Sequence, residues 1–135
     1  MTMNTFKSRY DPAWVKERYD SYGEREWNRW DVNPEEEVKF YIHRHYLERS
    51  VKKGQLILEI GAGAGRFTQI LAEFGAQIVV ADLSSVQLEI NKKKSQELGF
   101  AASIVDWIQL DVCDMSHLIH IKTATNVYIC FGQPN

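Results

Sequence analysis

The sequence has few cysteines, no excess of either charge and no apolar run near the ~20 residues of a membrane span. Two cysteines among 135 residues are too few for a disulfide framework, which is typical of the reducing cytoplasm. Sixteen Lys and Arg against 18 Asp and Glu leave no basic surplus of the kind that nucleic-acid-binding proteins show. The N-terminus also lacks the apolar core of a signal peptide. We therefore expect a soluble, cytoplasmic globular protein that binds neither nucleic acid nor membranes.

A metal site is not predicted either. The side chains that could form one are Cys113, His117, His120 and Cys130. Their spacing matches no standard pair-and-pair zinc pattern. We interpret them as buried thiols and surface histidines, and we expect no bound metal.

Residues 1–53 are predicted to form a helical extension. A first helix is expected over 12–22 and should stop near Gly23. The second has a clear start, because Asn33 can act as N-cap and proline and three glutamates follow it in the first turn. It should run to about Ser50. Apolar side chains recur along it at helical spacing and predict its buried face: Val38, Tyr41, Ile42, His45 and Tyr46.

Residues 54–135 alternate between strand and helix signals and are predicted to form an α/β core. Short apolar strands are expected at 56–60, 77–81, 105–110 and 126–131, with helices at 66–74 and 84–98. This alternation is typical of right-handed βαβ units and a mostly parallel sheet. In the second core helix, Ser84 and Gln87 have the spacing of a capping box. The apolar face expected for that helix comprises Val86, Leu88, Ile90 and Leu98.

Three glycines at alternate positions, Gly61, Gly63 and Gly65, follow the first strand. Glycine lets the backbone turn sharply and approach a ligand closely, and ligands of open α/β sheets bind at the carboxyl ends of strands. A dinucleotide-binding loop would place its third glycine where Arg66 stands, so that pattern fails; we read Arg66 itself as solvent-exposed. Glu59, two positions before the loop, would repel a pyrophosphate but suits a ligand with an ammonium or sulfonium group.

Acidic residues end the next two strands. Asp82 could accept hydrogen bonds from both hydroxyls of a ribose; alternatively, it caps the next helix. After the third strand, Asp111 could accept from an adenine amino group while the Val112 amide donates to a ring nitrogen. Three successive strand ends would then hold three parts of one nucleoside ligand.

With these motifs, the segment from about Val51 to Phe131 resembles the class I (Rossmann-like) S-adenosylmethionine-dependent methyltransferases. The resemblance implies a three-layer α/β sandwich with strand order 3-2-1-4, S-adenosyl-L-methionine as cofactor, S-adenosyl-L-homocysteine as product and a small-molecule acceptor. The stretch 19–30 is similar to the lid of small-molecule members. The cofactor-binding residues that the resemblance implies are Glu59, Gly61, Ala62, Gly63, Gly65, Asp82, Leu83, Asp111, Val112 and Cys130 of the core, with Tyr19 and Arg29 of the lid.

The sequence also departs from that family. Members usually have an aromatic-Asp pair before the fourth strand, where this sequence has Ala124-Thr125-Asn126-Val127. Members also continue through three further strands of a seven-stranded sheet. We therefore expect a short form that keeps the cofactor half, with an exposed edge at 126–131 that pairs two copies into a homodimer. No general base can be named. A non-catalytic nucleoside-binding module is the alternative function, and the glycine spacing disfavours an NAD-dependent oxidoreductase.

Overall fold

The fold is taken from a computed structural model that describes residues 10–114, residue 116 and the backbone of 126–129. The elements, in chain order, are α1 (Pro12–Tyr22), α2 (Arg25–Asn28), the 3-10 helix η1 (Arg29–Asp31), α3 (Pro34–Ser50), β1 (Leu56–Ile60), α4 (Arg66–Glu73), β2 (Gln77–Asp82), α5 (Ser85–Glu97), the 3-10 helix η2 (Ala101–Ser103), β3 (Ile104–Gln109) and β4 (Asn126–Ile129).

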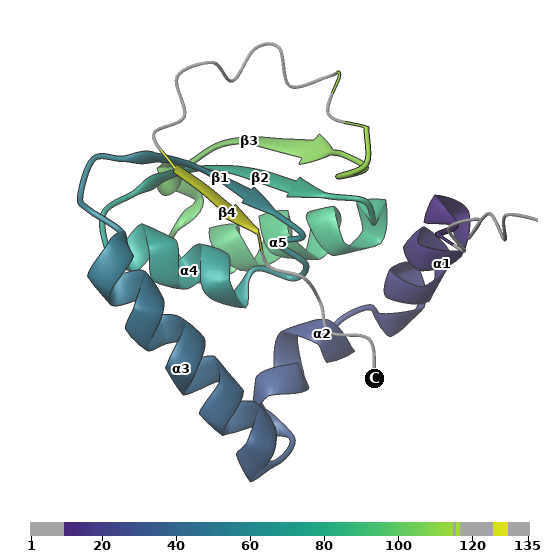
Figure 1. Ribbon diagram of the computed structural model, residues 1–135, viewed down its shortest axis with the longest axis horizontal. Helices are drawn as coiled ribbons and strands as arrows, with labels where there is room; N and C mark the ends of the chain where they lie inside the picture. The colour runs from purple at the N-terminus through teal and green to yellow at the C-terminus, as the bar shows by residue number, and fades with distance from the viewer. Residues whose placement is uncertain (1–9, 115, 117–125, 130–135) are drawn as a thin grey trace, which may run out of the picture.

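The four strands form one parallel sheet in the order β3-β2-β1-β4. The Rossmann-like α/β class and this strand order are therefore confirmed. Because the strands are parallel, all their carboxyl ends lie at the same edge of the sheet. The short helices α1 and α2 lie beyond that edge, where the strand arrows point in Figure 1.

Alternate residues of the strands supply two separate apolar clusters, one on each face of the sheet. Ile57, Ile78 and Val80 belong to the cluster that α4 and α5 complete, whereas Leu58 and Val79 belong to the other. Helices α3, α4 and α5 all lie on the first face (Figure 1). The described part of the chain thus comprises two of the three layers expected.

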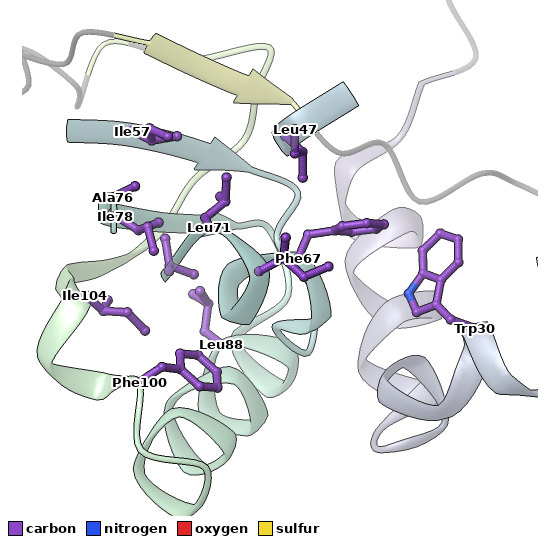
Figure 2. Packing of buried hydrophobic residues seen from close by; sticks show 12 residues of the cluster. Trp30, Leu47, Ile57, Phe67, Leu71, Ala76, Ile78, Leu88, Phe100 and Ile104 are labelled. Atoms are coloured by element: carbon purple, nitrogen blue, oxygen red, sulfur yellow. The ribbon is translucent and has the colours of Figure 1, made fainter. Parts of the chain in front are cut away.

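The N-terminal extension packs on the same core as the sheet. Trp30 of η1 is buried and lies edge-on to Phe67 of α4, with 5.1 Å between ring centroids. Phe40 of α3 stacks on the same phenyl ring at 5.3 Å. Figure 2 shows Trp30 at one end of the cluster beside Phe67, and Phe100 with Ile104 at the other. A single apolar cluster therefore joins residues of the 1–53 segment to the α/β core.

Helix α3 has the predicted limits but buries a different face. The Asn33 side chain accepts a hydrogen bond from the Glu36 amide at 2.9 Å, which confirms the N-cap. The predicted face was wrong: its side chains are exposed, with Tyr41 at 68%. Apolar side chains occur on both sides of this helix, and the neighbouring aromatic rings of η1 and α4 select the side that carries Phe40 and Leu47.

The buried face of α5 also differs from the prediction. Leu88 is buried, but Val86 and Leu98 are exposed, and most of the buried positions are polar. The Ser84 hydroxyl accepts from the Gln87 amide as a cap should, at 3.1 Å. The Gln87 side chain does not complete the capping box, because the Ser84 amide donates to Asp82 Oδ1 instead and Gln87 Oε1 has no hydrogen-bond partner. Contacts with α1 and with the glycine loop decide which side of α5 is buried.

Candidate functional site

The loop of residues 61–65 carries the chain from β1 into α4 at the carboxyl edge of the sheet. Gly61, Gly63 and Gly65 all have positive φ, at 72°, 56° and 107°, a region that side chains make costly. The amide of Gly61 donates to the carbonyl of Ala81 at 2.9 Å, which ties the loop to β2. The three glycines are therefore required by the backbone path itself.

A cavity of about 200 Å³ lies between this loop, the ends of the strands and the N-terminal helices. We call it the strand-end cavity. Six of the predicted binding residues line it: Tyr19, Gly61, Gly63, Asp82, Leu83 and Val112. Its other lining residues, which the sequence reasoning missed, are Tyr10, Val15, Glu26, Ile60 and Leu110. The structure thus brings parts of three strand ends and the lid around one space.

Asp82 connects the loop to the entry of α5. Its Oδ2 accepts from the Gly63 amide and its Oδ1 from the Ser84 amide, both at 2.8 Å. Burial raises the pKa of this carboxyl, while the same backbone N–H groups act to lower it. Asp82 thus holds the N-cap residue Ser84 in place, and the cap of α5 itself is the Ser84 side chain. Each carboxylate oxygen keeps a second lone pair, so a ligand hydroxyl in the cavity could still bind here.

Glu59 lies beneath the loop and is not among the residues that line the cavity. Its carboxyl is fully buried and accepts from Thr68 Oγ1 at 2.6 Å. Asn91 continues this network, because its Nδ2 donates to Thr68 Oγ1 at 3.1 Å and to the Gly63 carbonyl at 3.3 Å. Burial raises the pKa of Glu59 to about 8. The side chain is thus mostly uncharged at neutral pH, so it supports the loop from below rather than presenting a negative charge to a ligand.

Glu26, from the short helix α2, is the acidic side chain that sequence reasoning missed. It lines the strand-end cavity and is largely buried, with 13% of its side chain exposed. Burial raises the pKa of its carboxyl, while Arg29, whose Nη1 lies 3.2 Å away, acts to lower it. In the sequence it stands two positions from Glu24, which is exposed in the structure. Only the fold distinguishes the two acids.

Arg29 lies beside the loop rather than in the strand-end cavity. Its Nε is 3.5 Å from Glu36 Oε2, and its guanidinium lies over the Trp30 ring. It lines a small cavity of about 20 Å³ together with Ala62 and Gly65, two other predicted residues. It also lines a cavity of about 280 Å³, which we call the outer cavity, whose walls include Arg25, Val32 and Glu36. Glu26 borders all three spaces.

Polar contacts attach the lid to the core. The Ser84 hydroxyl donates to Asp20 Oδ1 of α1. The Gln87 Nε2 donates to the carbonyls of Tyr19 and Gly23, both at 3.0 Å. Two polar residues at the start of α5 thus hold the lid.

Arg66 also holds the lid, so its prediction as a solvent-exposed residue was wrong. Its Nη1 donates to the Trp27 carbonyl at 3.1 Å and to Asp31 Oδ2 at 2.8 Å. Its side chain is 17% exposed, and its guanidinium lies over the Phe40 ring at 5.0 Å. The residue that breaks the dinucleotide pattern therefore joins α4 to the N-terminal helices.

The end of β3 contributes Val112 to the cavity but not Asp111. Asp111 Oδ1 accepts from the Cys113 amide at 2.9 Å and from the hydroxyl of Tyr10 at 2.8 Å. Tyr10 does line the cavity, and burial together with the Asp111 carboxylate raises its pKa. Asp111 thus positions a wall residue of the cavity.

Several predicted features fall outside the described residues. Cys130, which the resemblance implies as a cofactor-binding residue, is one of them, as are His117 and His120. Cys113 is exposed. Over residues 10–114 and 116, no three His, Cys, Asp or Glu side chains are grouped as a metal would require. No helix in the same part of the chain is long and apolar enough to cross a membrane.

Comparison with known proteins gives one family and a set of similar folds. A family model described as a methyltransferase domain matches residues 57–133. No curated protein matches the chain. Among solved structures, magnesium protoporphyrin IX methyltransferase from Synechocystis PCC 6803 with bound S-adenosylmethionine is 22% identical, with TM-score 0.59, over 79% of this chain and 57% of that one.

Two further solved structures are similar over three quarters or more of this chain. The [4+2]-cyclase SpnF is 19% identical, with TM-score 0.64, over 78% of this chain and 44% of its own. A methyltransferase from Geobacter sulfurreducens in complex with S-adenosyl-L-homocysteine is 20% identical, with TM-score 0.55, over 75% and 37%. The chain thus spans between about a third and three fifths of the length of these three proteins, and at this identity they show a shared fold.

Proposed function

The chain belongs to the methyltransferase-domain family, whose model covers residues 57–133, and we propose from this that it binds S-adenosyl-L-methionine and methylates a small molecule. The observation that carries the proposal is the strand-end cavity. It lies at the carboxyl ends of β1, β2 and β3 and has Gly61, Gly63 and Asp82 on its walls. This is the edge at which open α/β sheets bind nucleotides.

The residues present fit the proposed cofactor. The second lone pairs of the Asp82 carboxylate suit the two ribose hydroxyls, beside a loop whose glycines allow close approach. The apolar side chains of Leu83, Leu110 and Val112 suit the adenine ring. Glu26 supplies a carboxyl to the same cavity and suits the ammonium group of the methionine part.

The cofactor, when bound, supplies an electrophilic methyl group. The contribution of this chain is then to hold and orient, and such positioning is worth up to about 7–11 kcal/mol of a barrier. Glu26 borders both the strand-end cavity and the outer cavity of about 280 Å³. We assign the outer cavity to a small-molecule acceptor, because the shared wall at Glu26 would place an acceptor beside the bound cofactor.

Calorimetric titration with S-adenosylmethionine, S-adenosylhomocysteine and NAD tests the cofactor. We expect both adenosyl ligands to bind and NAD not to bind. The variant Leu83→Trp fills the cavity without removing a hydrogen bond of Asp82 and should weaken S-adenosylhomocysteine binding at least about tenfold. Asp82→Asn should weaken it to a similar extent, while Glu24→Gln, an exposed lid position, serves as the matched control. Folded protein that binds neither adenosyl ligand would refute the proposal.

Formation of S-adenosylhomocysteine with a panel of small acceptors tests the methyl transfer. Product that depends on the acceptor supports the enzyme. Tight cofactor binding without any transfer would instead support the alternative, a non-catalytic S-adenosylmethionine-binding module.

A further inference from the structure

Helix α3 exposes a continuous apolar stripe on the side opposite its buried face. The exposed fractions are 56% for Val38, 68% for Tyr41, 47% for Ile42 and 65% for Tyr46, and His45 is exposed among them. We call these five residues the α3 stripe. Single exposed apolar residues are common on proteins, but a contiguous set at helical spacing is typical of an interaction surface. Packing in the core therefore does not explain why these exposed side chains are apolar.

The charges at the two ends of the stripe are opposite and equally spaced from its centre. At 100° per residue, Glu35 and Arg49 lie on the same side of the helix as Ile42. Glu35 is seven residues before Ile42 and Arg49 is seven residues after it, or about 10 Å along the axis in each direction. Both lie at exposed positions. Val38 and Tyr46 are likewise four residues before and after the same centre.

We propose that the α3 stripe is the contact surface of a homodimer, in which two copies of α3 pack antiparallel with Ile42 on the two-fold axis. Reversing the helix brings Glu35 opposite Arg49 of the partner subunit, twice per dimer. It also brings Val38 against Tyr46 of the partner subunit. A parallel arrangement would instead place like charges together. The sequence of the stripe is thus self-complementary in the way that a two-fold interface requires.

The size of the stripe predicts the strength of the dimer. A helix of 17 residues is about 25 Å long and, with its side chains, about 10 Å wide. Pairing along this length covers about 250 Å² on each subunit, or about 500 Å² in total. This is below the roughly 1,200 Å² at which stable specific interfaces start, and it places the contact among weak, transient ones. Glu35 also lies 3.1 Å from Lys39 of its own helix, but its side chain is 77% exposed and can accept a second cation. We therefore expect a dimer that dissociates in the micromolar range.

This surface is independent of the proposed cofactor site and of the strand edge at 126–131. No residue of the stripe lines the strand-end cavity. Of the strand edge, the structure describes only the backbone of Asn126–Ile129. Cofactor binding can therefore be measured separately, and a failure of the dimer would leave the proposed function untouched.

Sedimentation equilibrium from about 1 to about 200 µM protein tests the dimer. Ile42→Glu should make the protein monomeric over this range while leaving the circular dichroism spectrum unchanged. Glu35→Arg and Arg49→Glu should each weaken the dimer about tenfold, because two attractive pairs become repulsive. The matched control is Glu37→Arg, which has the same charge change in the same helical turn but lies off the stripe.

The two charge variants also test the antiparallel register. Mixed together, Glu35→Arg and Arg49→Glu should form a heterodimer, since every cross-subunit pair is then attractive again. The double variant should regain the wild-type dissociation constant. A wild-type protein that stays monomeric at about 200 µM would overturn the proposal. A dimer that neither Ile42→Glu nor the charge variants weaken would also overturn it, because another surface would then hold the subunits.

Discussion

The buried carboxyl of Glu59 makes the stability of this protein depend on pH in a way that Glu59→Gln should abolish. The folded protein holds the pKa of Glu59 at about 8, against an ordinary value of 4.5, chiefly because the side chain is completely buried. Glutamine keeps an oxygen that can accept from Thr68 Oγ1, as Glu59 Oε1 does at 2.6 Å. The substitution therefore removes the titration and preserves most of the packing.

The size of the effect follows from the difference between the two pKa values. Because the pKa is higher in the folded state, the contribution of Glu59 to stability is complete below pH 4.5 and is lost as the pH rises to about 8. One pKa unit corresponds to about 1.4 kcal/mol, so the full change is about 5 kcal/mol. Between pH 5 and pH 8, the free energy of unfolding of Glu59→Gln should rise relative to wild type by about 3–4 kcal/mol.

Urea denaturation of both proteins at several pH values between about 5 and about 9 measures this difference. Titrations that both proteins share cancel in the comparison, and Glu48→Gln, at an exposed position on α3, controls for the loss of one carboxylate. A difference that stays constant over the whole range would refute the reasoning, because Glu59 would then be ionised in the folded protein. S-adenosylhomocysteine should bind to Glu59→Gln about as tightly as to wild type, since Glu59 does not line the strand-end cavity.

Two further substitutions test how the loop and the lid are held. Gly65→Ala should lower the free energy of unfolding by about 2 kcal/mol, because the residue has φ 107° and the added Cβ would lie 3.0 Å from Asn91 Nδ2. The control is Gly54→Ala, at φ 84° in open space. In the same urea denaturation assay it should lower the free energy of unfolding by only about half as much. Gln87→Met removes the side-chain amide that donates to the carbonyls of Tyr19 and Gly23. Limited proteolysis should then cut α1 faster. Unchanged cleavage together with unchanged S-adenosylhomocysteine affinity would contradict the anchoring role.

The limits of the helices could be predicted from the sequence because local residues determine them. Asn33 and the proline after it start α3, and Gly23, at φ 52°, follows the last residue of α1. The buried faces could not be predicted in the same way. Apolar residues line both sides of α3, and only the position of Trp30 and Phe67 shows which side meets the core.

Some residues of the candidate site could also be predicted from the sequence, and others could not. The glycine loop and Asp82 could be placed at one edge of a parallel sheet from the sequence, because parallel strands end together. The protonation state of Glu59 could not be predicted in this way. A glutamate is expected from the sequence to be ionised at neutral pH, whereas burial raises the pKa of Glu59 to about 8 and leaves it mostly uncharged. Glu26 was missed because nothing in its immediate surroundings distinguishes it from Glu24.

The sequence by itself determined the order of the strands and of the four longer helices, the backbone turn at residues 61–65 and the family to which the chain belongs; it did not predict α2 or the two 3-10 helices. These depend on caps, glycines and apolar runs, which act within a few residues. Only the tertiary structure decided which carboxyl groups face the cavity, which arginines hold the lid and which side of α3 stays exposed. Those properties depend on desolvation and on contacts between residues far apart in the chain, such as Arg66 with Asp31. The spacing of residues along the chain does not predict them.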